Sequence, residues 1–154
     1  MALAPTGPAL PADEAARLAE LERYGLLDSP AEEEFDDFSQ LAAQLCATPI
    51  ALISLVDEQR QWFKSKVGLD ACETPREYAF CAHSILANQL FEVPDALEDP
   101  RFCDNPLVTD APHIRFYAGV PLTTSSGHNL GTLCVIDQRP RQLSEPQRKG
   151  LARL

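Results

Sequence analysis

The 154-residue sequence has no run rich in lysine or arginine, and its 13 basic residues are outnumbered by 23 acidic ones, which gives a net charge of −10. A chain of this sign repels the phosphate backbone of nucleic acids and anionic membrane surfaces. The sequence also lacks an apolar run of the ~20 residues that span a membrane, and it begins without the basic stretch of a secretory signal. We therefore expect a cytoplasmic protein with no nucleic-acid or membrane partner.

Closely paired cysteines are missing as well. The five cysteines are odd in number and form no Cys-x-x-Cys pair, which is unlike a secreted disulfide framework. We expect free thiols, with Cys46 and Cys134 as small core residues because both fall in apolar periodic segments. Cys81 and His83 lie two positions apart, where helical side chains do not face each other, so no metal site is predicted there.

Motifs of several enzyme classes are also absent. The sequence has no P-loop, no GxGxxG stretch that follows a strand and no ordered Ser-His-Asp set, so no catalytic residues are predicted. With 45% hydrophobic and 23% charged residues, the composition is that of an ordinary globular chain, and 154 residues suit one domain. Residues 1–12 have no helical or strand period and are expected to form a flexible arm. Residues 13–154 are expected to form the domain.

Two helices are predicted near the start of this domain. Apolar residues recur at helical spacing after Asp13, and Gly25 follows where a left-handed cap would end the first helix. Ser29 is followed three residues later by Glu32, which predicts a capping box at the start of a second helix. That helix is expected to end near Thr48.

Strand patterns occupy the middle and the last third of the chain. The predicted strands are Ile50–Val56, Gln61–Val67, Phe91–Val93, Arg115–Thr123 and Leu130–Asp137. Ile50–Val56 is nearly continuously apolar, as expected of a central strand that is covered on both faces. Alternation in the second strand predicts Phe63 and Ser65 on one face and Lys64 on the other. Two hairpins with helices at both ends indicate an α+β domain on a mostly antiparallel sheet.

Between the two hairpins lies a stretch with a different character. Residues 68–77 are predicted to be a loop and residues 78–87 a helix. Residues 94–112 contain four prolines and five acidic residues and are longer than an inert connection. The stretch Thr74–Leu122 also holds two of the three histidines and two of the five cysteines. Loops of this composition commonly carry binding groups on a rigid scaffold, so we expect function here.

Several blocks of the sequence resemble the GAF domains of bacterial signalling proteins. They are CAHSIL, DALEDPRF, NPLV and RFYAGVPL, flanked by SPAEEEFDDFSQLAAQLC, ALISLVDEQRQWFKS and LGTLCVIDQRPRQLS, so the resemblance runs from Leu18 to the last residue. It implies a central antiparallel sheet of about six strands, with the terminal helices together on one face and a small-molecule pocket on the other. Thr74–Leu122 would then form the wall and lid of the pocket.

The resemblance also implies which side chains face the ligand, whose identity it leaves open along with any cofactor. The predicted ligand-binding residues are Phe80, Cys81, His83, Arg115, Tyr117 and Thr132. For Arg115 the alternative is an ion pair with one of the nearby acids Asp95, Asp99 and Asp110. For Cys81 and His83 the alternative is packing alone.

Chemically active GAF subfamilies fit less well. Bilin-binding members carry a Cys-His pair before the strand that here begins at Arg115, whereas this sequence has His113 without a cysteine. Free methionine sulfoxide reductases place two cysteines loosely at Cys72 and Cys81, but their remaining thiol falls near Asp110, which is not a redox nucleophile. The NKFDE signature of cyclic-nucleotide GAF domains is absent, so cyclic nucleotides are unsupported.

The leading hypothesis is a non-catalytic sensory module that binds a small molecule and signals to an effector. In the family that it resembles, such modules are fused to diguanylate cyclases, to histidine kinases of two-component systems or to related enzymes. The alternatives are a redox enzyme of the sulfoxide reductase kind and a dimerisation scaffold with a degenerate pocket.

The last predicted helix supports a homodimer. Ser144 and Gln147 form a capping box at its start, and Leu151 and Leu154 continue an apolar stripe with no stop signal after it. We expect this helix, over residues 144–154, to continue into a C-terminal effector domain, and the terminal helices to form a parallel or near-parallel homodimer across a two-fold axis. The alternative is that both leucines pack on the domain's own first helices.

Overall fold

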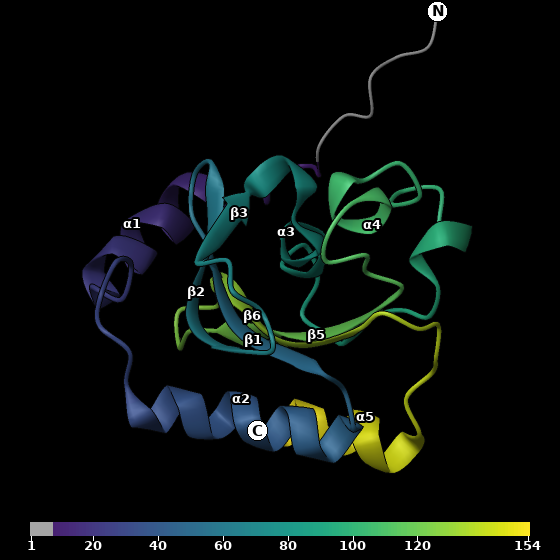
Figure 1. The fold of residues 1–154 in the computed structure, drawn as a ribbon. Helices are drawn as coiled ribbons and strands as arrows, with labels where there is room; N and C mark the ends of the chain where they lie inside the picture. The colour runs from purple at the N-terminus through teal and green to yellow at the C-terminus, as the bar shows by residue number, and fades with distance from the viewer. Residues whose placement is uncertain (1–7) are drawn as a thin grey trace, which may run out of the picture.

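The computed structural model describes residues 8–154, which form an open sheet with helices on both faces (Figure 1). The sheet has six strands in the order β3-β2-β1-β6-β5-β4, and every neighbouring pair is antiparallel. The strands are β1 (Ile50–Val56), β2 (Arg60–Val67), β3 (Glu73–Pro75), β4 (Phe91–Val93), β5 (Phe116–Thr123) and β6 (Asn129–Asp137). This architecture confirms the predicted α+β fold.

Five α-helices and two short 3-10 helices lie within residues 8–154. They are α1 (Glu14–Tyr24), α2 (Glu33–Cys46), η1 (Arg76–Tyr78), α3 (Phe80–Ser84), η2 (Ala96–Glu98), α4 (Pro106–Thr109) and α5 (Glu145–Arg153). Gly25 ends α1 with a φ of 65°, and the Ser144 hydroxyl accepts the Gln147 amide at the start of α5. Both predicted caps are therefore confirmed. Within the described residues, no helix is long and apolar enough to cross a bilayer.

Strand β1 separates the two layers, and all seven of its residues are buried. Ala51 and Ile53 belong to the cluster that packs against α2 and α5, where Cys46 is a small core residue as predicted. Ile50 and Leu52 face α3 and α4 on the opposite side. Figure 1 shows α2 and α5 together on one side of the sheet and α3 and α4 on the other. The continuous apolar run is thus a central strand with two covered faces.

Helix α1 lies at the end of the sheet rather than beside α2 and α5 (Figure 1). Leu21 packs there against Leu130 of β6. The fully buried Arg17 pairs with Glu14 at 2.9 Å, and Glu14 also pairs with Arg76 of η1. The Glu14 carboxylate therefore fixes α1 to the segment that follows β3.

Strand β2 departs from the predicted alternation at Lys64. Its register against β1 shifts so that Lys64 is an extra residue, as in a β-bulge. Phe63 consequently packs in the α3 layer, while the Ser65 hydroxyl lies 2.6 Å from the Ser39 hydroxyl of α2 on the other face. The prediction that Phe63 and Ser65 share a face is wrong because the bulge reverses the alternation.

The start of α2 also differs from the prediction. The helix begins at Glu33 with Glu32 as its cap, and Ser29 lies outside it. The Lys64 ammonium, whose side chain is fully buried, donates to the Ser29 hydroxyl at 2.7 Å and to the Pro30 carbonyl at 2.6 Å, and it pairs with Glu32. A buried charge needs such partners. The predicted capping box is wrong because Ser29 binds Lys64.

The middle of the chain is more ordered than predicted. Residues 73–75 of the predicted loop form β3, which pairs with the edge of β2. The predicted helix over residues 78–87 is reduced to α3, preceded by η1, and the long segment 94–112 contains η2 and α4. Of the predicted arm, residues 8–12 form no helix or strand, and residues 1–7 lie outside the described part of the chain.

Candidate functional site

A cavity of about 350 Å³ lies on the face of the sheet that α3 and α4 cover. Its floor comes from β1, β2 and β6, one wall from the segment between β2 and β3, and the other wall from α4 and the residues that lead to β5. Most of the lining side chains are aliphatic or aromatic. A concave, mostly apolar cavity of this size is typical of small-molecule sites.

The floor consists of four core side chains. They are Ile50 and Leu52 of β1, Phe63 of β2 and Ile136 of β6, and each is no more than 6% exposed. Ile50 and Ile136 are directly paired across the β1–β6 ladder. Because these strands are the centre of the sheet, the floor is rigid and a ligand there would contact the strands directly.

The first wall depends on a glycine. Gly68 follows β2 with a φ of 75°, and a Cβ at this position would lie 2.1 Å from the Pro49 carbonyl oxygen. The turn then brings residues 69–71 to the rim of the cavity. On its outer side, the Lys66 ammonium donates a 2.6 Å hydrogen bond to the Asp70 carbonyl. Both constraints hold the rim in place.

The second wall is held by side chains that cap backbone groups. Asn105 accepts the Leu107 amide at 2.9 Å, and its own side-chain amide donates to the Tyr78 carbonyl at 2.9 Å. The Arg115 guanidinium donates to the Val108 carbonyl at 2.8 Å. These bonds fix α4 over the sheet and place Leu107 against the cavity.

Few polar side chains line the cavity, and two of them, Gln61 and Thr74, are hydrogen-bonded to each other. The Gln61 side chain accepts a 3.1 Å hydrogen bond from Ser54 and donates a 2.6 Å hydrogen bond to Thr74. Asp70, which is exposed, is the single ionisable residue among the described residues that line the cavity. The lining therefore offers mainly apolar contacts, with a carboxylate at its rim.

Four of the six predicted ligand-binding residues lie together in the adjoining core. Phe80, Cys81, Tyr117 and Thr132 are each at most 2% exposed. The Tyr117 and Thr132 hydroxyls lie 3.2 and 3.0 Å from the Cys81 sulfur, and the Phe80 and Tyr117 ring centroids are 5.3 Å apart. None of the four is among the residues that line the 350 Å³ cavity. Their contact with a ligand stays a prediction.

The Cys81 thiol has an unusual environment. Burial raises its pKa, but hydrogen bonds from its neighbours outweigh burial and lower the pKa to about 6; the neighbours are Cys134, Ser54, Thr132 and Tyr117. Burial raises the pKa of Tyr117 and of Cys134 well above their ordinary values. Cys134 is fully buried, as predicted. The hydrogen bonds of the cluster thus oppose the effect of burial on a thiol that solvent does not reach.

His83 lies half-buried on α3, apart from these four residues. Its ring meets Phe102 edge-on at 4.8 Å, and both burial and the nearby Arg101 lower its pKa. It lines two hollows other than the 350 Å³ cavity. Across residues 8–154, no three His, Cys, Asp or Glu side chains are grouped as a metal ion requires.

Arg115 acts within the fold. Its guanidinium donates to the carbonyls of Val108 and Ile114, at 2.8 and 3.1 Å. No ion pair with the acids that sequence reasoning offered as partners, Asp95, Asp99 and Asp110, is found among the described residues, and Asp99 pairs instead with Arg101 at 2.6 Å. That alternative is wrong because backbone carbonyls take up the guanidinium.

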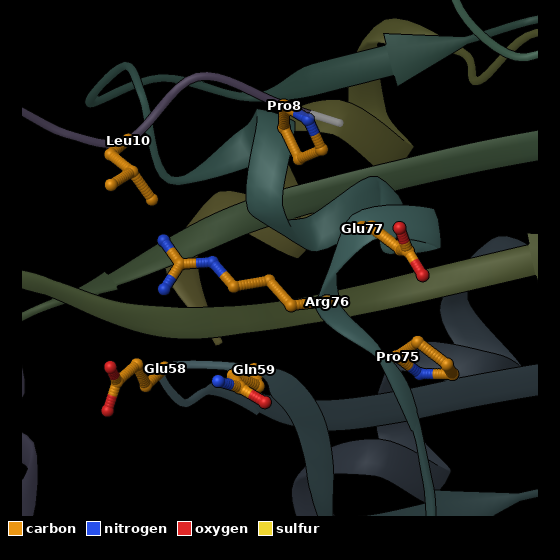
Figure 2. A pocket seen from close by; sticks show the side chains of 7 residues that line it. All are labelled: Pro8, Leu10, Glu58, Gln59, Pro75, Arg76 and Glu77. Carbon is orange, nitrogen blue, oxygen red and sulfur yellow. The ribbon is translucent and has the colours of Figure 1, made fainter. Parts of the chain in front are cut away.

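A second hollow, of about 380 Å³, lies beside the N-terminal segment (Figure 2). Its lining is Pro8, Leu10, Glu58, Gln59, Pro75, Arg76 and Glu77. Figure 2 shows the Arg76 side chain extending between Leu10 and Glu58, but its guanidinium is already bound to Glu14 and to the Asp57 carbonyl at 3.0 Å. Arg76, the only cation among the described residues of this lining, is therefore neutralised, which makes the apolar cavity the stronger candidate.

Sequence reasoning located part of the apolar cavity. Thr74, Leu107, Ala111, Pro112 and Ile114 of its lining all fall within the stretch that was predicted to form wall and lid. The floor and the rim at residues 68–71 were missed. The signal for the rim was a glycine directly after a strand, where the chain takes a positive φ that glycine adopts most readily.

Comparison with known proteins defines the family. A family model described as the GAF domain matches residues 13–153. Among curated proteins, the chain is 53% identical over 134 residues to a cyclic di-GMP phosphodiesterase of Pseudomonas aeruginosa. The alignment covers 87% of this chain but only 23% of that protein. This chain therefore spans less than a quarter of its curated relative.

Solved structures agree on the fold. The type II free methionine-R-sulfoxide reductase from Thermoplasma acidophilum has a TM-score of 0.64 at 13% identity, covering 86% of this chain and 88% of the other. The GAF domain from the Acinetobacter phosphoenolpyruvate-protein phosphotransferase has a TM-score of 0.62 at 19% identity, covering 90% and 87%. At sequence identities this low, the similarity shows a shared fold and nothing about function. Together with the family match over residues 13–153, they establish that this chain belongs to the GAF domain family.

Proposed function

We propose that this GAF domain is a non-catalytic regulatory module that binds a small molecule and signals through its terminal helices to an effector domain. The apolar cavity between the sheet and α4 is the observation that carries the proposal. The curated relative supports an effector on the same chain, because this domain matches less than a quarter of a protein named as a phosphodiesterase. Diguanylate cyclase and histidine kinase domains are the other effectors that we expect. The five free cysteines suit the reducing cytoplasm.

The route from cavity to helices runs through β1. Ile50 and Leu52 form the cavity floor, and the residues that alternate with them, Ala51 and Ile53, pack against α2 and α5. A closely packed interior transmits small displacements instead of absorbing them. A ligand that shifts β1 therefore changes the packing of α2 and α5.

An apolar stripe on α2 supports a homodimer. Phe38, Leu41 and Leu45 are 37–49% exposed, and their spacing of three and four residues places them on one helical face. Leu154, after the end of α5, is 39% exposed, whereas Leu151 is fully buried in the domain's own core. The seam of the proposed dimer therefore consists of the α2 stripe and Leu154, and Leu151 supports the fold.

The helix charges favour a two-fold pair. The first turn of α2 carries Glu33, Glu34 and Asp36, whereas the last turn of α5 carries Arg153. The Gln147 side chain near the start of α5 donates to the Leu45 carbonyl near the end of α2, so the two helices run antiparallel within one copy. A parallel two-fold pair, with its axis along the helices, would place the acidic turn of α2 beside the basic turn of its partner's α5.

The lowered pKa of Cys81 supports a second candidate, a thiol-dependent reductase. Such chemistry needs a thiolate that a substrate can reach. Cys81 is 2% exposed, and its hydroxyl neighbours belong to the core, so we rank this candidate below the sensor. Turnover of free methionine sulfoxide with a thiol reductant, lost in Cys81→Ser, would establish it and displace the first proposal.

Hydrogen exchange tests the sensor proposal. The molecule that co-purifies with the chain under non-denaturing conditions is identified by native mass spectrometry and then added back to emptied protein. Slower amide exchange in β1 together with a change in α2 and α5 is the expected result. Slower exchange at the cavity with unaltered α2 and α5 would show a binding site that does not signal. Absence of any bound molecule would favour the dimerisation scaffold.

A further inference from the structure

We infer that the cavity selects uncharged, largely apolar molecules and rejects anions, cyclic dinucleotides and other nucleotides among them. This inference rests on the proposed function, whose ligand it assigns to a chemical class. It has a practical consequence, because the curated relative is named for an activity on cyclic di-GMP and that anion is the obvious first candidate for this site.

The lining provides no counter-charge for an anion. Among the described residues that form the cavity, none is lysine, arginine or histidine. The only charged residue in this described part of the lining is Asp70 at the rim, whose carboxylate repels an anion. Phosphate recognition relies on arginine or lysine side chains or on free backbone amides at a helix end or a glycine-rich loop. The four-residue helix α4 offers no such end, because Asn105 already accepts the Leu107 amide.

Two cations that bond to residues of the walls are occupied outside the cavity. The exposed Lys66 ammonium donates to the Asp70 and Ala71 carbonyls, at 2.6 and 3.3 Å, and its side chain borders a different hollow. The Arg115 guanidinium donates to the Val108 and Ile114 carbonyls. Neither can turn to a ligand without giving up the hydrogen bonds that hold a wall of the cavity.

The floor also favours uncharged ligands, because it offers a charged group nothing to replace its hydration. Ile50, Leu52 and Ile136 offer no hydrogen bonds, and the Gln61 amide is bound to Ser54 and Thr74. A carboxylate or phosphate transferred from water to this surface loses its hydration without replacement. An apolar ring or chain instead gains from every contact with the floor.

Two matched probes test the inference. Tryptophol and indole-3-acetate share one ring system and differ by an uncharged hydroxyl against a carboxylate. We expect tryptophol to shift the amide resonances of β1 and of residues 68–71 in a nuclear magnetic resonance titration, with an affinity at least tenfold higher than that of indole-3-acetate. Cyclic di-GMP should cause no saturable shift at these amides. Equal or tighter binding of either anion, or no binding of tryptophol, would overturn the inference.

Variants at the rim show whether tryptophol binds in this cavity and whether the Asp70 carboxylate sets the preference against anions. Ala71→Trp, a substitution at an exposed position, should abolish tryptophol binding, while Ala19→Trp at an exposed position of α1 should not. Asp70→Lys should reduce the preference for tryptophol severalfold, whereas Glu77→Lys, an exposed acid outside the lining, should leave it intact. If Asp70→Lys leaves the preference for tryptophol over indole-3-acetate unaltered, the Asp70 carboxylate does not cause the rejection of anions.

The two proposals fail in different ways. If the molecule that co-purifies with the protein is an anion that occupies the cavity, the regulatory function stands and the uncharged class is wrong. If no molecule co-purifies and tryptophol does not bind, both proposals fail.

Discussion

The Thr132 hydroxyl of β6 lies 3.0 Å from the Cys81 sulfur of α3, so a polar contact joins this short helix to the sheet inside the core. The Tyr117 hydroxyl adds a second contact at 3.2 Å. A helix of five residues has little stability of its own, and these contacts keep α3 in place. The same contacts therefore determine both the environment of the Cys81 sulfur and the packing of α3 on the sheet.

We predict that Cys81 reacts slowly despite its lowered pKa. Hydrogen bonding favours the thiolate, but a side chain that is 2% exposed is closed to an alkylating reagent. With iodoacetamide at pH 7, exposed Cys72 should react first and Cys81 only when the protein unfolds, as peptide mass spectrometry would show. Modification of Cys81 at the rate of Cys72 would mean that the cluster opens to solvent, which the reductase candidate requires.

Acid should weaken the attachment of α1. Burial raises the pKa of Glu14, but its hydrogen bonds with Arg17 and Arg76 outweigh burial and lower the pKa from 4.5 to about 2. The stabilisation is complete above the unfolded value of 4.5 and is lost as the pH falls toward 2. Glu14→Gln should cost about 1–2 kcal/mol at pH 7, allowing for solvent screening, and little near pH 2.

Urea unfolding from pH 7 to pH 2 measures this effect. Glu22→Gln, at an exposed position of the same helix, serves as the control and should follow the wild type throughout. A pH-independent cost for Glu14→Gln would show that the carboxylate acts through packing and not through its charge.

Gly131 should be irreplaceable in β6. A Cβ at this position would lie 1.8 Å from the Ser54 carbonyl oxygen of the neighbouring strand, and both backbones are held in the ladder. Gly131→Ala should therefore destabilise the domain by about 3 kcal/mol. Gly25→Asn is the matched control, since nothing lies within 4 Å of a Cβ there and asparagine accepts the left-handed conformation. Thermal unfolding that ranks the two variants equally would contradict the close approach of β1 and β6.

The α2 stripe should control association. Leu41→Glu places a charge in the centre of the proposed seam and should convert a dimer into a monomer at micromolar concentration in sedimentation velocity. Leu97→Glu is the control, because this leucine is 47% exposed in η2, on the α3 side of the sheet. If the wild-type protein is monomeric at every concentration, the proposed homodimer is wrong.

The predicted parts of the fold depend on local signals. The apolar run of β1 is read correctly because a central strand is buried on both faces whatever surrounds it. Gly25 and the Ser144–Gln147 capping box mark helix ends through bonds within a few residues. Such features depend on residues that are close in sequence, so they can be predicted from a single sequence.

The failures come from contacts between distant residues. Ser29 resembles a helix cap, but Lys64, 35 residues away, takes its hydroxyl, and α2 starts four residues later, at Glu33. No residue of Gln61–Val67 marks the bulge at Lys64 in the sequence. The cavity floor was missed for a related reason: both faces of β1 are apolar, and nothing local says which face is left partly open.

We propose that the apolar cavity holds the ligand of a regulatory domain. Native mass spectrometry of wild-type protein, Ala71→Trp and Ala19→Trp, all purified without denaturation, tests this proposal. We expect a bound small molecule on the wild type and on Ala19→Trp, and none on Ala71→Trp. A molecule retained equally by all three proteins, or by none, would contradict the claim that this cavity is the site.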